Sequence, residues 1–174
     1  MITRSPVQWM LLPVQRYAQF SGRAPRAEYW WFVLFSILVG IPVGMIDAIM
    51  GIQLAGPLLS LGLLLPSLAV SVRRLHDLDR TGWWVLAPLL IILPTIAIAA
   101  VMGAGGAIAG LLGSGEAAGA GAGGAMIVLG VGLLAGGIIS IVMLIWYCSR
   151  GTAGDNRYGP DPLAEAANPT LYYS

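Results

Sequence analysis

Four apolar stretches alternate with short polar segments along this chain, and each stretch is long enough to cross a bilayer as a helix. A helix rises about 1.5 Å per residue, so about 20 apolar residues cover the roughly 30 Å of bilayer hydrocarbon. The stretches occupy residues 30–50, 54–72, 83–102 and 125–147. The pattern therefore predicts an all-α integral membrane protein with four transmembrane helices.

The remaining segments predict how the chain is organised around these spans. Residues 1–29 form an N-terminal segment, residues 30–147 the four-span membrane domain, and residues 148–174 a C-terminal tail. Residues 103–124 are rich in glycine and alanine, a composition that predicts first a flexible external loop and, as an alternative for part of it, a re-entrant or loosely helical segment. The mixture of apolar and polar positions between Trp9 and Phe20 predicts a short helix at the membrane surface.

The arginines predict which side of the membrane the two termini occupy. All nine basic residues are arginine, and none lies in the connections at 51–53 and 103–124. Because basic residues collect in cytoplasmic segments, both termini and the connection between the second and third spans are predicted to be cytoplasmic. Interfacial aromatic residues mark the same ends of the spans: Tyr29, Trp30, Trp31, Trp83, Trp84, Trp146 and Tyr147.

Composition supports the membrane interpretation and narrows the chemistry. The chain is 57% hydrophobic and 10% charged, with a mean hydropathy of +0.82, whereas a soluble domain carries about 25% charged residues. A single cysteine, Cys148, excludes an intramolecular disulfide and a cysteine-based metal site. The sequence has no P-loop, dinucleotide-binding glycine pattern or zinc-protease helix motif. We therefore predict no catalytic residue, metal site, cofactor or nucleic-acid partner.

Two features inside the spans leave alternatives open. Asp47, near the outer end of the first span, is either a proton or cation site or a carboxylate solvated at the interface. Gly132 and Gly136 match a GxxxG pattern in the fourth span, which predicts close helix packing, mostly within the monomer.

Three polar motifs lie on the predicted cytoplasmic side: GRAPRAEYW at 22–30, RRLHDLDRTGWW at 73–84 and GDNRYGPDP at 154–162. With these motifs in order around four apolar stretches, residues 14–163 resemble the bacterial inner-membrane family called domain of unknown function 805, the YhaH-like proteins. The matching positions are Phe20, Gly22, Arg23, Arg26, Glu28, Tyr29, Trp30, Arg73, Arg74, His76, Asp77, Gly82, Trp83, Gly154, Asn156, Tyr158, Gly159, Asp161 and Pro162. The resemblance implies a multi-pass inner-membrane protein, and it implies no activity because the family has no established one.

A compact bundle would bring these motifs together into one candidate ligand-binding or ion-pair cluster. Its predicted members are Arg23, Arg26, Glu28, Arg73, Arg74, His76, Asp77, Asn156 and Tyr158. Mutual ion pairing is one interpretation of the cluster, and a site where arginines hold a lipid phosphate or another anion is the other. A metal site is disfavoured because a single histidine and adjacent aspartates make a poor ligand set.

These observations predict an uncharacterised, non-enzymatic membrane binding or scaffold protein whose cluster binds anionic lipid or a protein partner. Asp47, the span prolines and the glycines of the fourth span favour an alternative, a small oligomeric transporter or channel. His76 and its aspartates support a further alternative, a membrane enzyme acting on lipid head groups.

Overall fold

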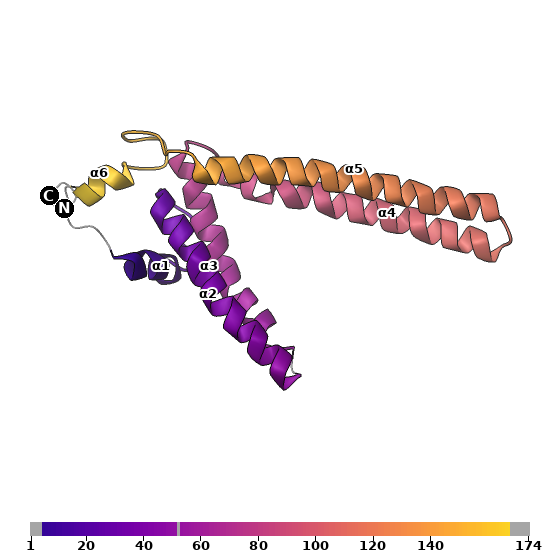
Figure 1. Cartoon of the computed structure of the whole chain (residues 1–174). Coiled ribbons are helices and arrows are strands. Elements are labelled where there is room, and N and C mark those ends of the chain that lie inside the picture. The colour runs from indigo at the N-terminus through magenta and orange to yellow at the C-terminus, as the bar shows by residue number, and fades with distance from the viewer. Residues whose placement is uncertain (1–4, 52, 168–174) are drawn as a thin grey trace. The chain divides into compact units, whose positions relative to one another are not determined.

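The computed structural model describes residues 5–51 and 53–167, and every regular element among them is a helix (Figure 1). Four helical segments are long and apolar enough to cross a membrane, which confirms the predicted fold. They are α2 (Arg26–Met50), α3 (Ala55–Asp77), α4 (Ala87–Leu111) with the preceding 3-10 turn η1 (Gly82–Leu86), and α5 (Gly115–Cys148). Arg4 and residues 168–174 of the predicted tail lie outside the described residues.

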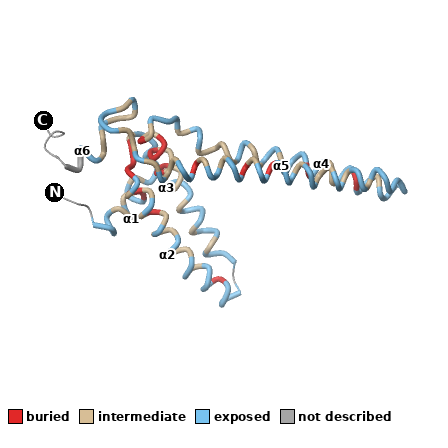
Figure 2. The backbone as a smooth tube through the Cα atoms, turned by 45° about the horizontal axis from the view of Figure 1, so that its top comes forward, coloured by how far each residue is buried: buried red, intermediate tan, exposed pale blue. Residues whose placement is uncertain are grey.

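The chain divides into two compact units, Met1–Val85 with Trp146–Ser174, and Leu86–Ile145. In the first unit, a small core of Ala24, Phe32 and Val70 lies between the start of α2 and the end of α3. Figure 2 shows that most of the buried residues of this unit gather at that end. Only 6% of the apolar window of α2 is buried, so lipid must cover most of its surface.

Asp47 caps the N-terminus of α3. Its two carboxylate oxygens accept hydrogen bonds from the backbone N–H groups of Ala55, at 3.1 Å, and Gly56, at 2.6 Å. Asp47 is only 9% exposed. A carboxylate at this position satisfies free N–H donors and interacts favourably with the helix dipole. Helix capping therefore accounts for Asp47, in place of the solvated carboxylate or ion site considered from the sequence.

A proline inside α3 leaves one backbone carbonyl without its helical donor, and the N-terminal segment supplies a replacement. Pro66 has no N–H, so the carbonyl of Gly62, four residues earlier, loses its helical hydrogen bond. The hydroxyl of Tyr17 donates to this carbonyl at 2.8 Å. Tyr17 follows the short helix α1 (Pro6–Gln15), which begins with a capping box between Ser5 and Gln8. The short N-terminal helix is thus present, and its position at the membrane surface stays a prediction.

We expect Tyr17→Phe to lower the free energy of unfolding by about 1 kcal/mol, because the Gly62 carbonyl is left without a donor. Thermal unfolding in detergent micelles measures the loss. In a Pro66→Ala background the new backbone N–H bonds Gly62, so the same substitution should cost much less. Equal costs in the two backgrounds would show that Tyr17 does not act through this carbonyl.

The second unit is a helical hairpin, and residues 103–124 are not the predicted flexible loop. Helix α4 continues to Leu111 and α5 begins at Gly115, so only residues 112–114 form the turn. The two helices run side by side (Figure 1), and an added Cβ at Gly121 would lie 2.6 Å from the Gly106 Cα. Glycine therefore serves close backbone packing here, which the composition alone does not distinguish from flexibility.

The GxxxG pair extends this packing along the same hairpin. A Cβ added at Gly132 would overlap the Thr95 side chain, and one at Gly136 would lie 3.3 Å from Ile92. Both partners belong to α4. The predicted packing within the monomer is confirmed.

Gly121→Ala should destabilise this hairpin, because its Cβ has no room against the backbone of Gly106. Gly119→Ala is the matched control, since nothing lies within 4 Å of its added Cβ. The control should raise stability by up to about 1 kcal/mol through helix propensity. Circular dichroism during heating in detergent gives the unfolding temperatures of the two variants. Shifts of the same sign relative to the wild type would contradict the close contact between Gly121 and Gly106.

Candidate functional site

The three polar motifs meet at what we call the arginine-rich end of the first unit, defined as residues 21–31, 73–84 and 146–162 (Figure 2). Helix α2 begins inside the first motif and α3 ends inside the second, so both motifs are partly helical. The third motif follows α5 and consists of turns that lead into the short helix α6 (Pro162–Ala167). Segments far apart in the sequence thus contribute to one polar site.

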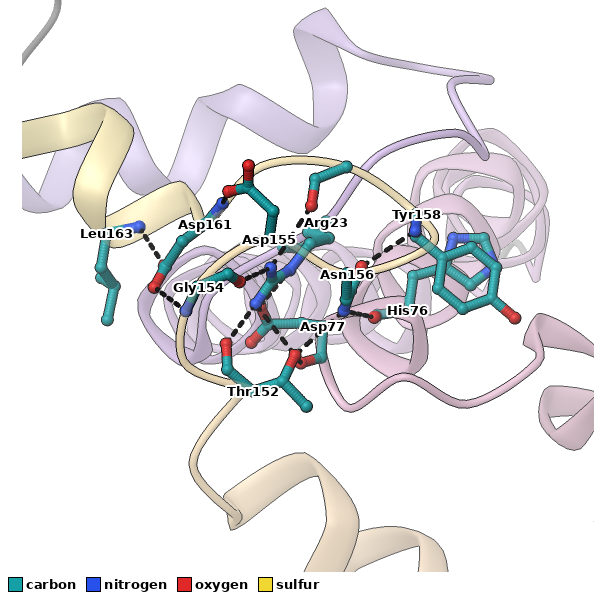
Figure 3. Close-up of polar contacts among 12 residues, drawn as sticks. Arg23, His76, Asp77, Thr152, Gly154, Asp155, Asn156, Tyr158, Asp161 and Leu163 are labelled. Atoms are coloured by element: carbon teal, nitrogen blue, oxygen red, sulfur yellow. Dashed lines mark hydrogen bonds and ion pairs between the residues drawn. The ribbon is translucent and has the colours of Figure 1, made fainter.

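Asp77 lies at the centre of this site, where it bridges Arg23 and Arg74. Figure 3 shows its contact with Arg23. Its Oδ1 accepts from Arg23 Nε at 3.1 Å and pairs with Arg23 Nη2 at 3.0 Å. Its Oδ2 pairs with Nη1 of Arg74. All three side chains are at most 5% exposed. One buried carboxylate therefore joins the segment before α2 to the last turn of α3.

The same two arginines bind the C-terminal segment through its backbone. Arg23 donates from Nη1 to the Gly154 carbonyl at 2.6 Å and from Nη2 to the Thr152 carbonyl at 2.5 Å. Arg74 donates to the carbonyls of Tyr147, at 3.3 Å, and Ser149. A planar guanidinium with five N–H donors can serve a carboxylate and several carbonyls at once. The third motif is thus attached to the other two.

A second buried ion pair joins α2 to α3. Arg73 Nη1 donates to Glu28 Oε1 at 2.5 Å, and these side chains are 0% and 1% exposed. Arg16 lies 3.9 Å from the other Glu28 oxygen. Nε and Nη2 of Arg73 have no hydrogen-bond partner within the described part of the chain. Because buried charges are costly unless paired, Glu28 is required to hold Arg73 in this position.

His76 supports the third motif by stacking. Its ring lies parallel to that of Tyr158, with the centroids 3.9 Å apart. Its Nδ1 is 3.2 Å from the carbonyl of Gly22, and a carbonyl only accepts, so Nδ1 carries the proton. The His76 carbonyl accepts from Asn156 Nδ2 at 2.9 Å (Figure 3). The imidazole and its backbone are therefore both engaged in packing the motif.

The turn of the third motif is built by its own polar groups. Asn156 and Gly159 form a short antiparallel bridge, and Gly154 adopts a left-handed φ of +75°. Asp161 accepts the N–H groups of Gly154 at 3.1 Å and Leu163 at 2.9 Å. Slight burial acts to raise the pKa of Asp161, but these backbone donors and the charge of Arg23 outweigh it, so the pKa is lowered. The carboxylate is thus held in its charged form near neutral pH.

Most of the predicted interfacial aromatic residues contact one another at this end. Tyr29 stacks on Tyr147 with centroids 4.5 Å apart and meets Trp30 edge-on at 5.3 Å. Trp84 and Trp146 are perpendicular at 5.3 Å, and the Arg80 guanidinium lies 3.9 Å above Trp146. Trp83 is 78% exposed. Their depth in the bilayer stays a prediction.

The structure brings together eight of the nine predicted cluster members in this network and leaves one outside it. Arg26 is exposed, and its Nη1 donates to the Cys148 carbonyl at 3.3 Å. Sequence reasoning missed Thr152, whose N–H donates to the Asp77 carbonyl at 2.8 Å. It also missed Gly151, where a Cβ would overlap the Asp77 carboxylate. Neither residue carries a recognisable single-sequence signal.

We expect Asp77→Asn to destabilise the protein strongly, by about 3 to 5 kcal/mol, because it leaves two buried guanidiniums without a counter-charge. Asp79→Asn is the control, since its pair with Arg157 is 3.0 Å long but about half exposed and should contribute no more than about 1 kcal/mol. Thermal unfolding in detergent measures both. A small effect at Asp77 would mean that the bridge is not structural.

The sequence of this chain is similar to known proteins over nearly its whole length. Residues 17–160 match the family described as "Protein of unknown function (DUF805)". The chain is 34% identical over 160 residues to Inner membrane protein YhaI of Escherichia coli K12, covering 90% of this chain and 96% of the relative. It is 29% identical over 165 residues to Inner membrane protein YhaH of the same organism, covering 91% and 99%. No solved structure matches the chain.

Proposed function

We propose that this chain, which belongs to the DUF805 family of inner-membrane proteins, is a non-enzymatic membrane scaffold that binds anionic lipid at its arginine-rich end. The proposal includes the cytoplasmic orientation of that end, which the arginine distribution favours. Anionic phospholipids of the inner leaflet would then lie beside it, and each nearby arginine contributes about 1 kcal/mol of attraction.

The observation that carries the proposal is the division of the arginines into two sets. Arg23, Arg73 and Arg74 are buried against Glu28 and Asp77. A second set is exposed and has no acidic partner among residues 5–51 and 53–167: Arg26, Arg80 and Arg150. At this end Glu28, Asp77 and Asp79 pair with other arginines, and the carboxylates of Asp155 and Asp161 accept backbone N–H groups. The exposed set therefore supports an attraction for anions.

The contacts of the candidate catalytic groups favour a scaffold over a head-group enzyme. A histidine that acts as a base needs a free ring nitrogen aimed at substrate and a group that orients the ring. Here Tyr158 covers one face of the His76 ring, and the Asp77 carboxylate is bound to two arginines. The Thr152 hydroxyl donates to the Asp77 carbonyl at 3.1 Å and accepts from Asn156 at 3.0 Å. The Asp77 carboxylate and the Thr152 hydroxyl are therefore committed to the network, so neither serves His76 as an orienting carboxylate or as a nucleophile.

The transporter alternative loses the features that favoured it. The Asp47 carboxylate caps α3, and the glycines of the fourth span pack on α4. The Gly62 carbonyl that Pro66 frees is bonded by Tyr17. Asp47, Pro66 and the Gly132–Gly136 pair are therefore explained by local structure and packing, and the exposed arginines favour binding at the membrane surface.

Native mass spectrometry of the full chain in detergent, with phosphatidylglycerol and phosphatidylcholine supplied together, tests the proposal. The wild type should retain phosphatidylglycerol preferentially. Joint replacement of Arg26, Arg80 and Arg150 by glutamine should reduce the preference by about fivefold per arginine, equivalent to about 1 kcal/mol each. The unfolding temperature should be unchanged because the three side chains are exposed.

Arg157→Gln is the control, since Arg157 is already paired with Asp79 at 3.0 Å. It should reduce the lipid preference less than any single member of the exposed set. Equal retention of the two lipids by the wild type would refute the proposed function.

A further inference from the structure

A groove at the arginine-rich end joins a charged mouth to an apolar wall. It has a volume of about 470 Å³ and is lined by Arg26, Ala27, Trp30, Trp31, Leu34 and Cys148. Five of these residues lie on the first three turns of α2, where spacings of three and four residues place them along one side of the helix. From Arg26 to Leu34 the groove follows α2 for about 12 Å, at about 1.5 Å per residue.

The mouth of the groove fits an oxyanion. Arg26 is exposed and has no acidic partner within the described ranges. One hydrogen bond, from Nη1 to the Cys148 carbonyl at 3.3 Å, holds the guanidinium beside the C-terminal end of α5. The guanidinium has five N–H donors, so donors remain for a two-point contact with a phosphate. No acidic side chain among the described residues therefore compensates the charge on Arg26.

Below the mouth, the lining fits a hydrocarbon chain. Trp30 is 37% exposed and Leu34 39% exposed, so both present apolar surface to whatever fills the groove. Ala27 is the smallest residue of the lining, so a bulkier side chain at this position takes up part of the groove. Tryptophan suits the boundary between head groups and acyl chains because its ring is apolar and its N–H is polar.

We propose that this groove binds one anionic phospholipid, with its phosphate on Arg26 and the first part of an acyl chain along Ala27, Trp31 and Leu34. A neutral ligand would leave Arg26 unpaired, and a phosphate without a chain would leave the apolar wall uncovered. Phospholipid has both parts and surrounds α2 in the membrane. The inference rests on the proposed function. That function attributes lipid binding to the charge of the whole arginine-rich end, whereas the inference places one bound lipid in this groove.

Two exposed arginines allow a matched test of the site. Arg26→Gln removes the charge at the groove, whereas Arg80→Gln removes a charge that lies over Trp146 and outside the groove lining. Ala27→Leu obstructs the groove and leaves Arg26 in place. Neither arginine takes part in the buried ion pairs, and the unfolding temperature of each variant verifies its fold.

The probe is dioleoyl phosphatidylglycerol, titrated onto the full chain in detergent and counted by native mass spectrometry. The wild type should bind one lipid more tightly than the rest. Arg26→Gln and Ala27→Leu should each lower the affinity for that lipid by about tenfold, as expected for loss of a charge-assisted contact or of packing against the acyl chain. Arg80→Gln should leave the binding of this first lipid unchanged and should reduce only the weaker binding of further lipids. Glycerol phosphate, which has no chain, should fail to compete at equal concentration.

The contrary outcomes separate the two proposals. If Arg26→Gln and Arg80→Gln weakened binding of the tightest lipid equally, the proposed lipid site in the groove would be wrong. The proposed function would stand, because lipid binding would then depend on the total charge of the arginine-rich end. Full competition by glycerol phosphate would also overturn the groove, since the chain would contribute nothing. Equal binding of phosphatidylglycerol and phosphatidylcholine by the wild type would overturn the proposed function, and the groove with it.

Discussion

The bridge from Asp77 to Arg23 and Arg74 is the interaction on which the arginine-rich end depends. Each of these side chains is almost completely buried, and burying a charge costs several kcal/mol unless it is paired and its hydrogen bonds are satisfied. Asp77 supplies the pairing for both arginines. The carbonyls of the C-terminal segment supply the remaining acceptors. Removing any one of the three motifs would therefore leave unmet donors or acceptors in the other two, which explains why they form one network.

The two units reach close packing by different physical means. In the first unit, the small apolar core and the buried ion pairs lie at one end, while most of the surface of α2 and α3 is left to lipid. In the second unit, glycines let the backbones of α4 and α5 approach one another. Lipid is as apolar as the side chains it covers, so hydrophobic burial does little to hold membrane helices together. Buried polar contacts and close backbone packing take its place.

The sequence predicted the spans because apolar length has one dominant explanation in a chain of this hydropathy. It predicted that Arg23, Arg74 and Asp77 would converge because the motifs share one end of the spans. It did not predict the carbonyl partners of Arg23, since a backbone carbonyl is present at every residue and leaves no signature. It also misjudged residues 103–124, because flexible linkers and tightly packed glycine helices have similar compositions. Arg23 and Arg26 are three residues apart, and only geometry separates the buried one from the exposed one.

All nine basic residues of the chain are arginine. The contacts in the structure explain why lysine could not replace arginine at some of these positions, but not at others. Arg23 uses Nε, Nη1 and Nη2 together, on a carboxylate at one edge and two carbonyls at the other. A lysine ammonium has three donors at a single point and cannot span these acceptors. Arg74 is placed in the same way, so lysine at either position would leave buried acceptors unmet. Arg80 and Arg150 make no comparable set of contacts among the described residues, and their charge alone supports binding at the membrane surface. Arg26 stands between the two groups, because holding a phosphate at the mouth of a groove uses the planar geometry of arginine as well as its charge.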